Sequence, residues 1–181
     1  MIYCLDTSGV LDGWKRHYPK EILPELVADV DALVSQRRII IPEDVVKELK
    51  RHDDDAYRWA AKHKSCHIPL TEEIQKFAKE VVLAQFPKLL AVSAGKSGGD
   101  PWLIATAKIH RAMVITGEHF GGPAHPKVPF VCEQLGILHG GFIDILKREG
   151  WNFTRSATRR PRQVLEPRIA ASQSDELPFE T

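Results

Sequence analysis

The sequence predicts an α/β protein, a three-layer α/β/α sandwich with a mainly parallel central sheet. Short apolar runs typical of buried strands alternate with longer segments in which apolar residues recur at helical spacing. This alternation favours parallel strands joined by helical crossovers. With 181 residues, 43% of them hydrophobic, the chain is long enough to bury the core of one domain. We expect that domain over residues 1–153 and a polar tail over 154–181, where the apolar periodicity disappears.

The elements of the first half are predicted by their apolar pattern and by the residues at their ends. Residues 2–5 form a short buried strand that stops at Asp6, and residues 39–41 form a second one. A helix is expected to begin at Pro24, because proline is favoured in the first helical turn, and another follows Pro42. Further helices are expected over 54–64 and over 71–84, the second capped by Thr71.

In the second half, a helix is predicted from Asp100-Pro101 through Arg111, and its almost uniformly apolar surface indicates burial. Residues 112–116 form a third buried strand that ends just before Glu118. A short helix, a short strand and a last helix are expected over 131–135, 137–139 and 142–149, with Gly136 and Gly150 ending the two helices.

Charge and cysteine content exclude several classes of protein. The formal net charge of +1 gives no long-range attraction for a polyanion, so any phosphate contact must be local. Cys4, Cys66 and Cys132 are odd in number and form no CxxC pair, which argues against a disulfide framework or a zinc ribbon. With no signal-peptide pattern and no apolar run of about 18 residues, we expect a cytoplasmic protein outside the membrane.

Four acids are the candidate catalytic residues: Asp6, Glu48, Asp100 and Glu118. Asp6 and Glu118 follow the first and third predicted strands, and ligands of parallel sheets gather at the carboxyl ends of strands. Asp100 opens the buried helix, and Glu48 borders the apolar stripe of the helix after the second strand. Like charges this close need compensation, and an all-oxygen set suits Mg²⁺ or Mn²⁺. The pattern indicates metal-dependent phosphodiester hydrolysis, with Asp6, Asp100 and Glu118 as ligands.

Simpler explanations exist for two of these four positions. Asp100 before Pro101 is a good helix N-cap pair, and an isolated Glu48 would be interpreted as a solvated helix residue. The negative charge of Asp44 is favourable near a helix N-terminus, and Asp44 is the alternative metal ligand. Asp6 is the hardest to explain without a partner, because a charge at the end of a buried strand is costly.

Polar and basic residues near these acids are candidate supporting groups. Thr7, Ser8 and Thr116 have hydroxyls that could hydrogen-bond metal-bound water, or equally satisfy backbone groups at strand ends. Lys47, Arg51 and His119 are candidate substrate contacts, although a solvated face explains most basic residues as well. A phosphate-binding P-loop over Gly95-Lys96-Ser97 is rejected, because Leu90 stands where its first glycine belongs.

In their order along the chain, four segments resemble motifs of the PIN-domain superfamily. They are LDTSGVL (Leu5 to Leu11), IPEDVVKEL (Ile41 to Leu49), GGDPWLIATA (Gly98 to Ala107) and VITGEH (Val114 to His119). The resemblance implies a PIN-like fold and an Mg²⁺- or Mn²⁺-dependent ribonuclease of the kind found as the toxin of toxin–antitoxin pairs. It further implies an RNA substrate, a cognate antitoxin protein and a possible homodimer.

Two alternatives from other functional classes stay open at this point. One is a non-catalytic PIN-like binding module that has lost its metal. The other is a haloacid dehalogenase-like phosphatase that uses Asp6 as its nucleophile. That class wants a second acid two residues further on, and Ser8 occupies the position.

Overall fold

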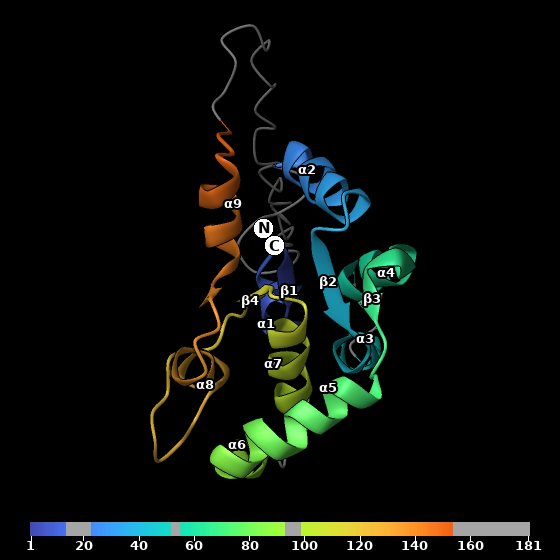
Figure 1. Ribbon diagram of the computed structural model, residues 1–181. Coiled ribbons are helices and arrows are strands. Elements are labelled where there is room, and N and C mark those ends of the chain that lie inside the picture. The colour runs from blue at the N-terminus through green and yellow to red at the C-terminus, as the bar shows by residue number, and fades with distance from the viewer. Residues whose placement is uncertain (14–22, 52–54, 93–98, 154–181) are drawn as a thin grey trace, which may run out of the picture.

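The central feature of the fold is one sheet of five parallel strands in the order β3-β2-β1-β4-β5 (Figure 1). The computed structural model describes residues 1–13, 23–51, 55–92 and 99–153. The strands are β1 (Tyr3–Leu5), β2 (Ile39–Pro42), β3 (His67–Ile68), β4 (Met113–Ile115) and β5 (His139–Gly140). Each of these strands pairs in parallel with its neighbours, and helices flank the sheet. The predicted three-layer α/β/α architecture, expected also from the PIN-like resemblance, is confirmed.

Helices connect the strands, and several begin and end where the sequence predicts. They are α1 (Thr7–Leu11), α2 (Pro24–Ser35), α3 (Glu43–Lys50), α4 (Asp55–Lys62), α5 (Glu72–Phe77), α6 (Lys88–Val92), α7 (Asp100–Ile109), α8 (Val128–Gln134) and α9 (Phe142–Glu149). Lys64–Cys66 forms a 3-10 turn, η2, and Ala78–Leu83 a π-helical segment, η3, that continues α5. Thr71 caps α5 by accepting from the Ile74 amide at 3.3 Å. Gly150 ends α9 with φ +68°, which glycine adopts without strain.

The structure corrects the sequence prediction at short elements and at two boundaries. It adds α1, β3 and α6, none longer than five residues, because such elements are too short to show a periodic pattern. Helix α8 begins three residues before the predicted Val131, with proline in its first turn, and β5 lies later than the predicted 137–139. The glycine-rich segment 93–98 and the expected tail lie outside the described residues.

The core is built from the central strand and the helix packed across it. Every residue of β1 is fully buried, and Leu103, Ile104 and Ala107 of α7 join the same apolar cluster. Helix α7 contacts β1, β2 and β4 (Figure 1). The order strand, helix, parallel strand places the start of α7 towards the carboxyl edge of the sheet, as the strand directions in Figure 1 show.

A charged network closes the opposite, amino edge. Glu149 of α9 accepts from the Tyr3 hydroxyl at 2.5 Å and from both terminal nitrogens of Arg38 at 2.8 and 2.5 Å. Arg38 also donates to the Met1 carbonyl at 3.0 Å. Burial and the Glu149 carboxylate raise the pKa of Tyr3 to about 12, so the phenol stays a donor across the working pH range. The network joins β1, the entrance to β2 and the last helix.

We expect Tyr3→Phe to destabilise the fold by about 1–2 kcal/mol, because it removes a half-buried hydrogen bond to a charged acceptor. Urea unfolding followed by circular dichroism measures the change. The matched control is Lys147→Ala on α9, the helix that carries the Glu149 acceptor. The Lys147 side chain is 70% exposed and lies 3.8 Å from Asp144, so its ion pair should contribute less than about 0.5 kcal/mol. Equal effects of the two substitutions would show that the Tyr3 bond does not contribute.

Two further expectations concern membranes and thiols. Over the described ranges no helix has both the length and the apolar character needed to cross a membrane. Cys4, Cys66 and Cys132 are buried as free thiols, and burial raises the pKa of each. Buried thiols held protonated are poor nucleophiles.

Candidate active site at the carboxyl edge of the sheet

Asp6 stands where β1 ends and α1 begins. It has extended backbone angles and acts as the N-cap of α1, accepting from the Thr7 amide at 2.7 Å. Its other carboxylate oxygen accepts from the hydroxyls of Ser8 at 2.5 Å and Thr116 at 2.8 Å. The side chain is therefore both a helix cap and the centre of a polar cluster.

Burial dominates the electrostatics of this carboxylate. Asp6 is 8% exposed, and its pKa is raised above the ordinary aspartate value chiefly because burial disfavours the charged form. The hydrogen bonds from Ser8 and Thr116 oppose that shift, and the negative charge of Glu118 adds to it. Glu118 is thus close enough for its charge to disfavour the charged form of Asp6.

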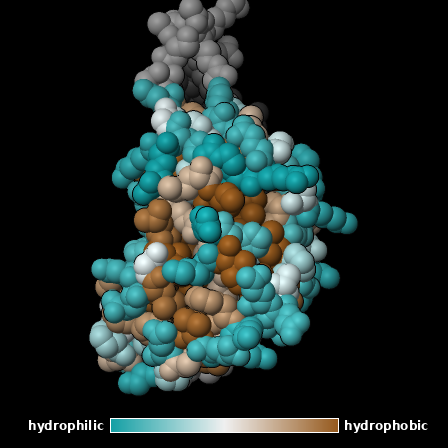
Figure 2. All heavy atoms as spheres, in the orientation of Figure 1, coloured by the Kyte–Doolittle hydropathy of each residue, from teal (hydrophilic) through white to brown (hydrophobic). Residues whose placement is uncertain are grey.

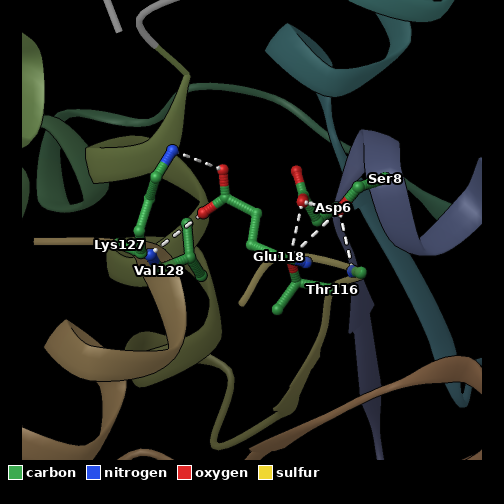
Figure 3. A network of polar contacts seen from close by, with 7 residues as sticks. Asp6, Ser8, Thr116, Glu118, Lys127 and Val128 are labelled. Carbon is green, nitrogen blue, oxygen red and sulfur yellow. Dashed lines mark hydrogen bonds and ion pairs between the residues drawn. The ribbon is translucent and has the colours of Figure 1, made fainter. Parts of the chain in front are cut away.

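The end of β4 is tied to Asp6 through hydroxyl groups (Figure 3). Ser8 and Thr116 contact each other at 3.0 Å, and Ser8 accepts from the Gly117 amide at 2.8 Å. Thr116 accepts from the Glu118 amide at 3.2 Å. These contacts fix the turn that carries Glu118, so Thr7, Ser8 and Thr116 all bond directly within the cluster that the sequence predicted they would support.

Glu118 directs its carboxylate away from Asp6. Figure 3 shows it turned towards Lys127 and Val128, where it accepts from the Lys127 ammonium at 3.4 Å and from the Val128 amide at 3.2 Å. Val128 opens α8, so a carboxylate here is also favoured by the helix dipole. The predicted fourth acid therefore lies at the site and already has a cationic partner.

Glu48 joins the cluster through Thr7. Its carboxylate accepts from the Thr7 hydroxyl at 2.6 Å, while the Thr7 amide bonds Asp6. Glu48 is half-buried on α3, which agrees with the predicted position beside the apolar stripe. One residue thus connects two predicted catalytic acids from separate elements.

Asp100 lies at the start of α7, towards the same edge of the sheet. The prediction that it is an N-cap is wrong: Gly99 is the N-cap of α7, and Asp100 is the first helical residue, half-buried, with Pro101 after it. A Cβ on Gly99 would lie 3.8 Å from the Cβ of Asp44. Gly99, the residue before Asp100, therefore lies against the first turn of α3 at Asp44, the alternative ligand.

The structure adds one acid that the sequence analysis missed. A Cβ on Gly117 would lie 2.1 Å from Oδ2 of Asp12, so the Asp12 carboxylate occupies the space left by this glycine, between Thr116 and Glu118 along the chain. Asp12 ends α1, one helical turn after Ser8. The spacing of four residues between Ser8 and Asp12 places both on one face of a helix. It could not be used from sequence, because α1 was not predicted.

Sequence comparison assigns a family to this arrangement. Residues 3–153 match the family described as Domain of unknown function (DUF4411). The chain belongs to the DUF4411 family. No curated protein matches it significantly. A solved structure described as "Structure of FitAB bound to IR36 DNA fragment" is 17% identical, with 77% of this chain and 94% of that chain covered and a TM-score of 0.42. That likeness adds nothing to the topology described above.

The predicted substrate contacts of this DUF4411 chain lie at the surface. Lys47 is exposed and paired on its own helix with Glu43 at 2.9 Å and Asp44 at 3.6 Å. Arg51 is exposed at the C-cap of α3, and His119 is exposed beside Glu118. Their role in substrate binding remains a prediction.

The acids do not form a preformed metal cage. Among the residues that the structure describes, no group of three or more histidine, cysteine, aspartate or glutamate side chains has the arrangement of a metal site. Asp6, Glu48 and Glu118 are instead bonded to hydroxyl, amide and ammonium donors.

Proposed function

We propose that this DUF4411 chain is a metal-dependent endoribonuclease that hydrolyses RNA phosphodiester bonds. The observation that carries the proposal is Asp6, a buried carboxylate at the carboxyl end of the central strand, whose pKa is raised by burial and by the neighbouring charge of Glu118. Holding two acids together at a sheet edge is unfavourable for stability alone, and functional sites are where such arrangements recur. The PIN-like order of the acids along the chain supports the same assignment.

The donor set fits Mg²⁺ or Mn²⁺ in chemistry, with Asp6 and Glu118 as the residues that would hold the ion once the Glu118 carboxylate turns from Lys127 towards Asp6. Both ions prefer oxygen ligands, and Mg²⁺ usually binds through one or two carboxylates together with water and substrate phosphate. A cation beside Asp6 would offset the burial of the charge and the smaller effect of Glu118, which together raise its pKa. When bound, such an ion supplies a more acidic water and neutralises charge that builds up on the phosphate. Asp100 is proposed as the third ligand, and Glu48 as a further ligand or a water-orienting group.

The residues around Asp6 have separate proposed roles. Ser8 and Thr116 orient the Asp6 carboxylate, because each donates to the same oxygen. Thr7 holds Glu48 in position, and Glu48 would orient a water or act as a further ligand. Lys127 is an ammonium at the edge of the site that a substrate phosphate could share with Glu118.

The test is Mn²⁺ binding and RNA cleavage by the full chain. We expect saturable stabilisation in thermal unfolding, about 2–3 kcal/mol when Mn²⁺ reaches about a hundred times its Kd. Cleavage of a single-stranded RNA should stop with EDTA and resume when Mg²⁺ or Mn²⁺ is restored. Glu80→Gln, at an exposed acid of η3, is the control and should leave both readouts unchanged. Cleavage that continues in EDTA would refute the metal requirement.

The PIN resemblance extends the proposal to partners. We propose that the chain is the toxin of a toxin–antitoxin pair, that it acts in the cytoplasm as a homodimer, and that a cognate antitoxin covers the acidic site. Co-expression with the neighbouring reading frame, followed by co-purification and loss of RNA cleavage in the complex, tests the pairing.

A second candidate function is a non-catalytic binding module. The hydrogen bonds that engage Asp6 and the Lys127 pair that engages Glu118 favour it, because both acids are already compensated without an ion. The Mn²⁺ titration separates the two candidates, since a binding module should show no saturable stabilisation.

A further inference from the structure

An exposed aromatic ring follows the candidate site by two residues. Phe120 is 45% exposed, although phenylalanine is usually buried. Its ring lies nearly perpendicular to that of Phe130 on α8, with centroids 5.8 Å apart, and tilted against the His139 ring at 6.3 Å. The ring therefore has aromatic neighbours that support it while almost half of the residue faces solvent.

The loop that carries Phe120 is held in shape by its backbone. Gly121 forms an antiparallel bridge with Pro126, and the amides and carbonyls of Gly122 and His125 bond each other reciprocally at 3.2 and 3.1 Å. Gly121 has φ +74°, and a Cβ there would lie 2.7 Å from Lys127 and 2.8 Å from the His125 carbonyl. The ring is thus presented by a closed loop, which lowers the entropy cost of placing a ligand on it.

The polar groups on this loop suit a nucleic acid more than an apolar protein surface. His119 and His125 are exposed on the same loop as hydrogen-bonding side chains, and Lys127, which pairs with Glu118 at 3.4 Å, is the ammonium at the end of the loop. Aromatic rings beside cationic groups are the usual components of single-strand binding sites, where bases stack and the backbone meets positive charge. Figure 2 shows apolar surface interspersed with polar side chains on the face drawn, without a continuous polar cover.

We propose that Phe120, with His139 beside it, is the stacking position for an RNA base next to the phosphate held at the acidic site. The inference rests on the proposed ribonuclease function and names how its substrate is held. Two residues of chain span at most about 7 Å, so Phe120 lies within the reach of one nucleotide from Glu118. Any base has a π-face, so this position would bind single strands with little sequence preference.

The experiment measures RNA affinity separately from cleavage. The full chain carrying Asp6→Asn is titrated with a short fluorescein-labelled oligouridylate in Mg²⁺ and followed by fluorescence anisotropy. Adding Phe120→Ala should weaken binding roughly tenfold, and Phe120→Leu should do the same because it keeps apolar area but loses the ring. Phe120→Trp should retain affinity. Leu138→Ala, at a 54%-exposed aliphatic residue adjacent in sequence to His139, is the matched control and should not change it.

The outcomes distinguish this inference from the function on which it rests. Full affinity in Phe120→Ala, or in Phe120→Leu alone, overturns the stacking position, while RNA cleavage by the unsubstituted chain would leave the ribonuclease proposal standing. If Phe120→Ala leaves RNA affinity unchanged but alters the oligomeric state in gel filtration, the ring belongs to a protein interface. That result also overturns the stacking position. A chain that neither binds nor cleaves RNA would refute both proposals together.

Discussion

Asp6→Asn should lower RNA cleavage by about a hundredfold or more while leaving the chain folded. Loss of a carboxylate that holds a catalytic ion removes several kcal/mol of transition-state stabilisation, and each 1.4 kcal/mol or so is a factor of ten in rate. The amide retains an oxygen for the Thr7 amide and has the shape of the acid it replaces, so the α1 cap survives. Single-turnover cleavage with the Glu80→Gln control measures the effect. Activity within a few-fold of wild type would contradict the proposed role.

The same variant should change how stability depends on pH. Because the pKa of Asp6 is raised in the folded state, that state binds the proton more tightly than the unfolded chain. The stabilisation is present below the ordinary aspartate pKa of about 3.9 and is lost as the pH rises through the raised value. The Asp6→Asn side chain does not titrate, so the variant has no such loss. In EDTA, the free energy of unfolding of the variant relative to wild type should therefore increase from pH 4 to pH 7. A constant difference across that range would show that the raised pKa has no effect on folding.

Gly9→Ala should destabilise the fold by about 3 kcal/mol, the upper part of the range for overpacking. A Cβ at this position of α1 would lie 2.3 Å from the carbonyl oxygen and 2.8 Å from the carbonyl carbon of Ile115. Both are backbone atoms of β4, so relief requires the helix or the strand to move. In an exposed helix the same change would stabilise by up to about 1 kcal/mol, so the structure reverses the sign of the propensity-based expectation.

Thermal unfolding checks this prediction, and a drop of roughly 10 °C is expected for a domain of this size. Gly122→Ala is the control, because a Cβ at Gly122 meets no atom within 4 Å. Since Ile115 precedes Thr116, a folded Gly9→Ala protein should also cleave RNA more slowly. A melting temperature equal to wild type would show that α1 does not pack on β4 this closely.

Elements with a clear periodic pattern and a chemical stop were predictable from sequence. Helix α9 begins at Phe142 and ends at Gly150 as expected, because its apolar face and left-handed C-terminal glycine are local properties. Strand β2 and helix α3 follow the apolar run and Pro42 in the same way. The five-residue α1 was missed, since a helix this short depends on packing rather than propensity.

The alternation of apolar strands and amphipathic helices in the chain alone determined the α/β fold, and the same pattern showed which acids stand at strand ends and helix starts. The tertiary structure decided what each acid bonds to. Asp6 meets Thr116, 110 positions away, and Glu118 turns to Lys127, while Asp12 reaches Gly117 through a helix that was not predicted. Such contacts depend on how β1, α1 and β4 pack, and hydrogen bonds between remote residues form only once that packing has brought their side chains within about 3 Å.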